Sequence, residues 1–314
     1  MDDIFITRQN RKTMISILSK IYALRRIKMV IKKTNKLNRK QIKDVMQLIE
    51  ECRSVEPTMI APVLTNEGNF DPELPNMFLC EEQGYLISYV SIFMPSPYYG
   101  EVVAFTSPAA RKRGYFMKTW LEALKVLGPH IEEMEIMFLT DGNSPSALAT
   151  LQALEMHYEY SEYVLAKDIE RKDWDFRITV KELDPNNVKD SNAIFMLHTN
   201  IFPDGRSETL TFMESTKLPG TQNFLAIGPE GKPVGLFHMT LDGDRVFLFG
   251  VGVLPEYQGK GYAKQMVQLA QNMCDDEFTA IGVQVSSLNE EAMGLYRSCG
   301  FREVNRLDYW YDEM

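Results

Sequence analysis

The stretch that decides the fold is residues 245–270, which read RVFLFGVGVLPEYQGKGYAKQMVQLA. Its first part alternates apolar residues as a strand does, and its last part spaces them as a helix does. The short loop between them contains Gly259 and Gly261. The first turn of a helix exposes unpaired N–H groups, and glycines let a phosphate approach that backbone closely. The stretch is therefore either an ordinary strand-to-helix turn or a turn that binds an anion.

Two common phosphate-binding motifs do not fit this loop. A P-loop has the pattern G-x-x-x-x-G-K-[ST], whereas Gly259-Lys260 is followed by Gly261. The dinucleotide pattern G-x-G-x-x-G also fails, because the place of its third glycine is taken by Pro255 in one frame and by Lys264 in the other. An anion site here would need another kind of loop.

Residues 258–263 (QGKGYA) match the pattern [QR]-x-x-G-x-[GA] at each specified position. This loop resembles the acyl-CoA pyrophosphate loop of the GNAT superfamily of N-acetyltransferases. The preceding stretch, 247–257 (FLFGVGVLPEY), resembles the fourth strand of that family and its exit. Downstream, 280–301 resembles the family's fifth strand, an asparagine and a helix, through Asn289, Ala292, Leu295, Tyr296, Gly300 and Phe301.

The resemblance implies acetyl-CoA as co-substrate and no metal. It implies that main-chain amides of the loop bind the pyrophosphate and that the main chain of the preceding strand pairs with the pantetheine arm. The implied cofactor-binding residues are Val251, Gly252, Val253, Gln258, Gly259, Lys260, Gly261, Tyr262 and Ala263. Asn289 is implied to hydrogen-bond the pantetheine arm; capping the next helix is an alternative role, and one side chain can serve both.

Amide formation from a thioester needs a proton for the leaving thiolate. In view of the resemblance, Tyr296 is the candidate general acid, because a phenol with a pKa near 10 is protonated at neutral pH. The alternative is that Tyr296 is a packing aromatic beside Leu295.

The reaction also needs a neutral amine. A lysine-like amine is mostly protonated at pH 7, and deprotonating it costs roughly 4–5 kcal/mol. Many relatives place a Glu on the fourth strand for this step, but 245–254 contains no carboxylate. His238 is the candidate base, with a buried structural histidine as the alternative. Glu208 and Glu214 in the predicted long loop are other candidates, and a low-pKa amine or a water chain would need none.

An internal repeat precedes this region. Residues 111–116 (RKRGYF) also follow a predicted strand and open a helix, and they depart from the loop pattern only at Phe116. In the helix after the next strand, Leu151 takes the place of Tyr296. The first copy has therefore lost the hydroxyl. It either keeps a second nucleotide site at Arg111, Lys112, Arg113 and Gly114 or is a degenerate structural domain.

The predicted fold class is α/β (α+β), with two tandem GNAT-like domains, each a mixed, mostly antiparallel sheet flanked by helices. The predicted divisions are an N-terminal extension at 1–28, a degenerate domain at 29–170 and a catalytic domain at 175–314. The extension is basic and amphipathic, so it is either a docked helix or the product of a misassigned start.

Several local signals predict where elements begin and end. Asn38 and Gln41 form a capping box that opens a helix. Asp184, followed by a proline, is the predicted N-cap of the second domain's first helix. A long loop is predicted over 200–222, and two strands are predicted to close the chain near Tyr311.

Composition narrows the class of protein. The 314 residues carry a net charge of −9, which argues against broad nucleic-acid binding. The four scattered cysteines argue against a zinc site or a disulfide framework, and no apolar run reaches membrane-spanning length. We therefore expect a cytoplasmic protein without a nucleic-acid or membrane partner.

The leading functional hypothesis is an acetyl-CoA-dependent N-acetyltransferase with its active site in the second domain. Its acceptor would be a small-molecule or peptide amine, because the sequence does not specify the acceptor pocket. The alternatives are a non-catalytic acyl-CoA sensor or interaction protein and, ranked lower, an aminoacyl-tRNA-dependent acyltransferase. The oligomeric state is left open.

Overall fold

The structure is a computed structural model and describes residues 29–128, 130, 134–203, 205–242 and 245–311. The predicted N-terminal helix within 1–28 lies outside these residues. The chain divides into two compact units. Unit 1 takes the described residues up to Ser161 together with those from Arg306, and unit 2 is Glu162–Asn305. None of the helices in the described part of the chain has the length and apolarity needed to cross a membrane.

Each unit is built on one mixed sheet. The elements of unit 1 are β1 (Val30–Thr34), α2 (Arg39–Val55), β2 (Met77–Glu82), β3 (Tyr85–Ser96), β4 (Tyr99–Thr106), the 3₁₀ turn η1 (Pro108–Ala110), α3 (Tyr115–Leu127), β5 (Glu135–Asp141), α4 (Pro145–Ala153), the start of β6 (His157–Asp168) and the end of β12 (Arg302–Tyr311). Its strands follow the order β1-β2-β3-β4-β5-β12. The β4–β5 pair is parallel, and the β1–β2, β2–β3, β3–β4 and β5–β12 pairs are antiparallel.

Unit 2 repeats this plan with the rest of β6, β7 (Thr179–Leu183), α5 (Val188–Ile201), α6 (Arg206–Ser215), β8 (Gln222–Ile227), β9 (Pro233–Asp242), β10 (Arg245–Val253), η2 (Pro255–Tyr257), α7 (Tyr262–Met273), β11 (Ala280–Ser286) and α8 (Glu290–Ser298). Its order is β6-β11-β10-β9-β8-β7, with β10 and β11 as the parallel pair. The predicted fold class is confirmed.

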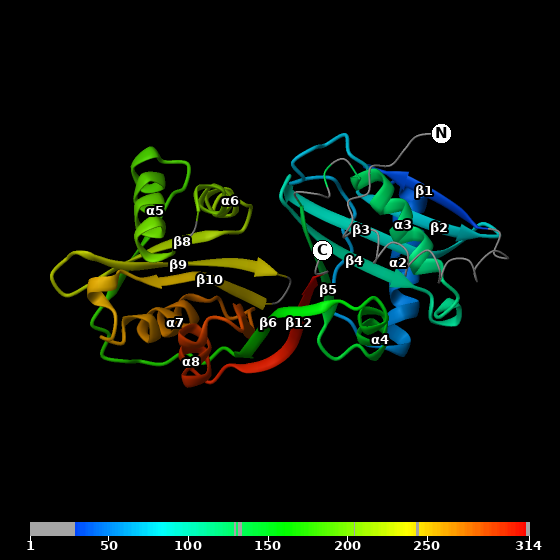
Figure 1. Cartoon of the computed structure of the whole chain (residues 1–314). Coiled ribbons are helices and arrows are strands. Elements are labelled where there is room, and N and C mark those ends of the chain that lie inside the picture. Colours follow the sequence, from blue (N-terminus) through cyan, green and yellow to red (C-terminus); the bar gives the residue numbers. More distant parts are fainter. Residues whose placement is uncertain (1–28, 129, 131–133, 204, 243–244, 312–314) are drawn as a thin grey trace. The chain divides into compact units, whose positions relative to one another are not determined.

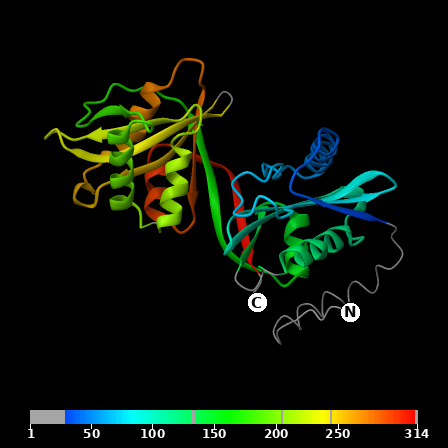
Figure 2. The same ribbon diagram turned by 90° about the horizontal axis from the view of Figure 1, so that it is seen from above.

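Helices cover both faces of each sheet. In unit 2, α5 and α6 lie on one face and α7 and α8 on the other (Figure 1). In unit 1, α2 and α3 lie on opposite faces (Figure 2). The α2 face buries an apolar cluster that includes Val45, Ile49 and Leu79. The α3 face buries a second cluster that includes Trp120 and Phe138.

The parallel pair of each unit parts before its strands end. The β10–β11 ladder stops at Phe247 and Gly282, although the two strands continue to Val253 and Ser286. The β4–β5 ladder of unit 1 likewise stops short of the ends of both strands. Each unit therefore has a splay, by which we mean the opening between its two parting parallel strands.

Three local predictions can be compared with the structure. The capping box of α2 is confirmed, since the Asn38 side chain accepts from Gln41 N and the Gln41 side chain accepts from Asn38 N. The predicted N-cap at Asp184 is wrong, because Asn187 caps α5 by accepting from the first free N–H groups of the helix. The predicted loop 200–222 contains α6, and one strand, β12, closes the fold instead of two.

The predicted boundary at 170–175 differs from the observed division, which falls inside β6 and again inside β12. Within unit 1, the end of β12 pairs antiparallel with β5. Asp308 anchors this strand: its buried carboxylate accepts from Arg306 Nε at 2.8 Å and from Ser161 Oγ at 2.6 Å. Unit 1 thus takes a strand from a part of the chain that follows unit 2.

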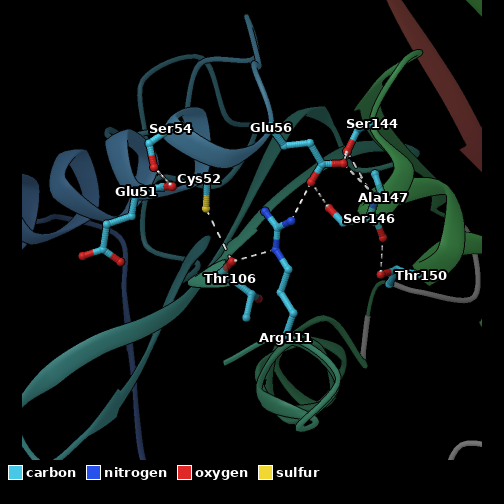
Figure 3. A network of polar contacts seen from close by, with 10 residues as sticks. All are labelled: Glu51, Cys52, Ser54, Glu56, Thr106, Arg111, Ser144, Ser146, Ala147 and Thr150. Carbon is cyan, nitrogen blue, oxygen red and sulfur yellow. Dashed lines mark hydrogen bonds and ion pairs between the residues drawn. The ribbon is translucent and has the colours of Figure 1, made fainter. Parts of the chain in front are cut away.

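A second polar network in unit 1 is centred on Glu56 (Figure 3). Its Oε1 accepts from Ser144 Oγ at 3.0 Å and from Ser146 N at 2.8 Å. Its Oε2 accepts from Ser146 Oγ at 2.6 Å and from Arg111 Nη1 at 2.5 Å. Arg111 Nε also donates to the Thr106 carbonyl at 3.3 Å. The end of α2, the loop before α3 and the start of α4 are therefore held together by one carboxylate.

Asp308 provides a test of the strand that closes unit 1. Replacing it with alanine leaves the buried Ser161 hydroxyl and the half-buried Arg306 guanidinium without this acceptor, which costs about 2 kcal/mol. We expect amide hydrogen exchange in peptides from β5 and β12 to accelerate about 30-fold, the rate equivalent of that loss. The control is Asp276→Ala, whose side chain is 100% exposed. Equal exchange in the two variants would contradict this role.

Glu56 provides a test by pH. Burial alone would raise its pKa, but its hydrogen bonds to Ser146, Arg111 and Ser144 outweigh burial and lower the pKa from 4.5 to about 2. The stabilisation is therefore present above pH 4.5 and is lost as the pH falls toward 2, a total of about 3 kcal/mol.

In urea unfolding across this pH range, we expect Glu56→Gln to be less stable than wild type at neutral pH and to show a flatter acid decline. Glu50→Gln, at a carboxylate with 65% of its side chain exposed on the same helix, serves as the control and should keep the wild-type decline. An unchanged decline in Glu56→Gln would show that the network does not stabilise the carboxylate.

Candidate functional site

The glycine loop of unit 2 forms a backbone cradle at the start of α7. Gly259 and Gly261 have φ angles of +71° and +75°, in the left-handed region that glycine adopts without strain. Gly261 is the N-cap of α7, so the first N–H groups of that helix point out of the loop. A Cβ added at Gly259 would meet nothing within 4 Å. The cradle is open to a ligand on that side.

The polar side chains of the loop fix its shape. Gln258 Nε2 donates to the Val253 carbonyl at 3.1 Å, which ties the loop to the end of β10. Lys260 Nζ donates to the Glu256 carbonyl at 3.2 Å and lies 4.8 Å from the centre of the Tyr257 ring. The lysine charge is therefore held beside the cradle.

Arg177, which the sequence analysis missed, lies next to the cradle. Its Nη2 donates to the Lys260 carbonyl, and a Cβ added at Gly261 would lie 3.7 Å from the same nitrogen. Its guanidinium lies 5.4 Å from the centre of the Tyr262 ring, and its backbone N donates to Gln265 Oε1 at 2.7 Å. Arg177 precedes β7 and lies more than 80 positions before the loop in the sequence, so no local pattern connects the two.

The strand that enters the loop is irregular where the sequence predicts pantetheine binding. The β9–β10 register shifts between Phe249 and Gly252, and Gly250 has a φ of +56°. Val253 is buried in the apolar cluster of unit 2, and Val251 packs against it. Gly252 faces the other side, where an added Cβ would lie 2.5 Å from Ile201 Cγ2.

Tyr296 lies on α8 in the same apolar cluster. It is buried, and its ring centre is 5.5 Å from that of Phe301 in an edge-on contact. Burial raises the pKa of Tyr296 above its ordinary value, so the phenol is protonated at neutral pH. Asn289 is the N-cap of α8 and accepts from Ala292 N at 2.9 Å. The cluster brings Tyr296 together with Val251, Val253, Tyr262 and Ala263.

His238 is fully buried on β9, next to the bulge of β10. Asn223 Nδ2 donates to the Thr216 carbonyl at 3.0 Å, which turns Asn223 Oδ1 toward His238 Nδ1 at 2.7 Å. Nδ1 therefore carries the proton, and Nε2 keeps a lone pair for which the described residues offer no hydrogen-bond donor. Burial, followed by the nearby His198, lowers the pKa of His238 to about 3. The imidazole is neutral at physiological pH.

An aromatic group surrounds His238 on the face covered by α5 and α6. Phe212 lies 5.1 Å from His238 and stacks on His198 at 3.9 Å. Phe249 lies 5.2 Å from His238. A Cβ added at Gly250 would lie 2.8 Å from His238 Cδ2, so the aromatic group packs closely against the bulge of β10 and leaves no room there for a side chain. Glu214, the other described candidate base, is 74% exposed and paired with Lys217.

The corresponding loop of unit 1 keeps the backbone of the cradle. Lys112 and Gly114 have φ angles of +63° and +82°, and Gly114 is the N-cap of α3. Arg111, which takes the place of Gln258, makes the equivalent bond to the Thr106 carbonyl but also pairs with Glu56. Phe116 takes the place of Ala263 and lines the unit 1 splay. The second nucleotide site stays a prediction, and in this structure Arg111 is engaged by Glu56.

Comparison with known proteins agrees with this geometry. Residues 192–301 match the model of the acetyltransferase (GNAT) family. No protein with a curated description matches the chain.

Solved structures resemble the chain over most of its length. A GCN5-related N-acetyltransferase from Sphaerobacter thermophilus has a TM-score of 0.72 at 16% identity, covering 90% of this chain and 95% of that one. A tandem GNAT protein from the clavulanic acid biosynthesis pathway has a TM-score of 0.66 at 13% identity, covering 91% and 98%. At these identities the likeness shows the fold, which is that of tandem GNAT proteins. Residues 192–301 in the second unit thus carry the GNAT family match, within a chain whose fold is that of tandem GNAT proteins.

Proposed function

We propose that the chain is an N-acetyltransferase that moves an acetyl group from acetyl-CoA to a primary amine, with its active site in unit 2. The observation that carries this proposal is the open cradle at Gly259 and Gly261, which directs the N–H groups of α7 outward beside a splay. An anion bound there would be stabilised by the unpaired amides and by the helix dipole.

In this proposal the diphosphate lies on the main chain of residues 258–263, with Arg177 adding positive charge. The pantetheine arm enters the splay and pairs with the main chain of Val251 and Val253 as a strand would. Asn289, exposed at the start of α8, lies on the other side of the splay. Holding the thioester in this way makes the reaction with the amine effectively intramolecular, which can supply much of the rate.

Tyr296 would donate the proton that the leaving thiolate needs. A general acid must be protonated before the step, and its raised pKa meets that requirement. The carbon–sulfur bond of the thioester breaks as the amine nitrogen forms the amide bond. The thiolate takes the phenolic proton, and the proton that the amine nitrogen loses on becoming an amide returns to the phenolate through the solvent.

His238 is poorly suited to deprotonate the amine. Transferring a proton from an ammonium group with a pKa near 10 to an imidazole with a pKa of about 3 is uphill by roughly 10 kcal/mol. We infer that the acceptor reacts from the small fraction of neutral amine in solution or is an amine of low pKa. His238 would then position the β10 bulge through its contact with Gly250.

The competing function is an acyl-CoA-binding protein without turnover. It is favoured by the burial of Tyr296 and by the lack of a carboxylate in residues 245–254. Release of free thiol from acetyl-CoA in the presence of a panel of primary amines separates the two functions. Binding of CoA without thiol release for any amine class would favour the competing function.

Tyr296→Phe tests the general acid. We expect kcat for thiol release to fall at least about tenfold while the Kd of CoA, measured by calorimetry, stays unchanged. The reason is that the variant removes one hydroxyl that acts on the leaving group and keeps the packing of the ring. Tyr85→Phe is the matched control, because Tyr85 is a 74% exposed side chain in unit 1. Equal losses in kcat and in CoA affinity would contradict the assignment.

Gly259 offers a charge test of the cradle. Asparagine and aspartate both tolerate the left-handed backbone and have nearly the same shape, so Gly259→Asn and Gly259→Asp differ mainly in charge. A carboxylate about 4 Å from a diphosphate costs roughly 1 kcal/mol per charge even in water. We therefore expect CoA to bind Gly259→Asp about tenfold more weakly than Gly259→Asn in calorimetry. Equal affinities would place the diphosphate elsewhere.

A further inference from the structure

Unit 1 contains a cavity of about 600 Å³ in the splay between β4 and β5. Its wall is mainly apolar and includes Val102, Phe105, Phe116, Phe138, Leu151 and Leu154. We propose that this cavity binds an uncharged, largely apolar small molecule, and that Glu56 and Phe116 exclude phosphate-bearing carriers such as acetyl-CoA from it. The proposal does not depend on catalysis by unit 2.

The size and the wall of the cavity match those of a ligand site. Pockets that bind small molecules have volumes of roughly 300–1,000 Å³ and are lined mostly by apolar and aromatic side chains. Protein interiors otherwise pack densely, and large voids are uncommon. A ligand that covers Phe116, Phe138 and Leu151 would remove apolar surface from water, which is favourable at roughly 25 cal/mol per Å².

The polar groups of the wall around Glu56 are already bonded to one another. Glu56 accepts four hydrogen bonds, including one from Arg111, and Arg111 also donates to the Thr106 carbonyl (Figure 3). The Cys52 thiol donates to the same carbonyl at 3.4 Å, and Thr150 Oγ1 donates to the Ser146 carbonyl at 2.8 Å. A charged ligand would have to break these bonds, whereas an uncharged apolar ligand would leave them intact.

Glu56 also places a negative charge at the splay. Its side chain is 16% exposed and lines the cavity. A phosphate there would therefore lie beside a carboxylate that water screens only in part and that already pairs with Arg111. Unit 2 has a neutral side chain, Gln258, at the position of Arg111, and among the described residues it donates to a main-chain carbonyl and not to a carboxylate. The two splays therefore differ in that unit 1 has an ion pair where unit 2 has a neutral side chain, although their backbones are alike.

Phe116 adds a steric difference. It takes the second position of α3, where α7 has Ala263. The small residue of unit 2 leaves room beside the cradle, whereas the phenyl ring of unit 1 packs against the apolar cluster under α3 and forms part of the cavity wall. The second residue of the helix therefore leaves space for a diphosphate in unit 2, where it is Ala263, and favours an apolar ligand in unit 1, where it is Phe116.

Two fluorescent probes with one ring system test the chemistry of the ligand. N-Phenyl-1-naphthylamine is uncharged, and 8-anilinonaphthalene-1-sulfonate carries one negative charge on the same rings. With the full chain, we expect the uncharged probe to bind one site at least about tenfold more tightly than the sulfonate. Tighter binding of the sulfonate would overturn the proposal.

Two variants locate the bound probe. Ala104 lies on β4 and lines the cavity, so Ala104→Trp should fill it and weaken the uncharged probe at least about tenfold. Ala109 is an exposed alanine outside the cavity wall, and Ala109→Trp should leave the affinity unchanged. Both variants are checked for unaltered thermal unfolding. An affinity that is insensitive to Ala104→Trp in a folded protein would place the probe elsewhere and overturn the assignment.

CoA binding tests the exclusion of phosphate carriers. In a Gly259→Asp background, which weakens the cradle of unit 2, we expect CoA not to displace the uncharged probe. Adding Glu56→Gln should free Arg111 and strengthen binding of the sulfonate probe at least about tenfold relative to the uncharged one. Displacement of the probe by CoA while Glu56 is present would show that the cavity of unit 1 is a nucleotide site and would overturn the proposal. This outcome would leave the proposed function of unit 2 untouched, because that function is tested by CoA binding to the Gly259 variants.

Discussion

A parallel strand pair that parts before its strands end is the constraint on which both units depend. Once β10 leaves β11, the main-chain groups on its open edge no longer have the partners that a ladder supplies, and buried main-chain groups need partners. An extended ligand can provide them, as can water. The helix that follows each splay has its own free N–H groups at the same place. Binding capacity thus follows from backbone geometry before any side chain is considered.

The two units then use this backbone differently. In unit 2 a neutral glutamine closes the loop onto the end of β10, and Arg177 adds charge from outside the loop. In unit 1 an arginine makes the equivalent bond and is neutralised by Glu56. Arg111 in unit 1 thus replaces Gln258 of unit 2, and the carboxylate of Glu56, at the end of α2, balances its charge. Duplicated folds of this kind keep the main chain and diverge in the charge and volume of a few side chains.

Much of the fold could be predicted from the sequence because its signals are local. The capping box at Asn38 and the turn at Gly259 each need only a few neighbouring residues. Helix α6 was missed because its stability comes from tertiary contacts, such as the stacking of Phe212 on a histidine of α5. Arg177 and Glu56 were missed because their partners lie 83 and 55 positions away along the chain. The strand partner of β5 could not be predicted for the same reason.

The place of β12 has a consequence for biosynthesis. A nascent chain emerges from the ribosome in order, and its domains usually fold as each is completed. Unit 1 cannot follow that order, because the strand that pairs with β5 is translated only after the whole of unit 2. Until then the edge of β5 remains open, and an open strand edge invites pairing with other chains. Unit 2 is thus complete before unit 1 is, and the first half of the chain is the last to mature.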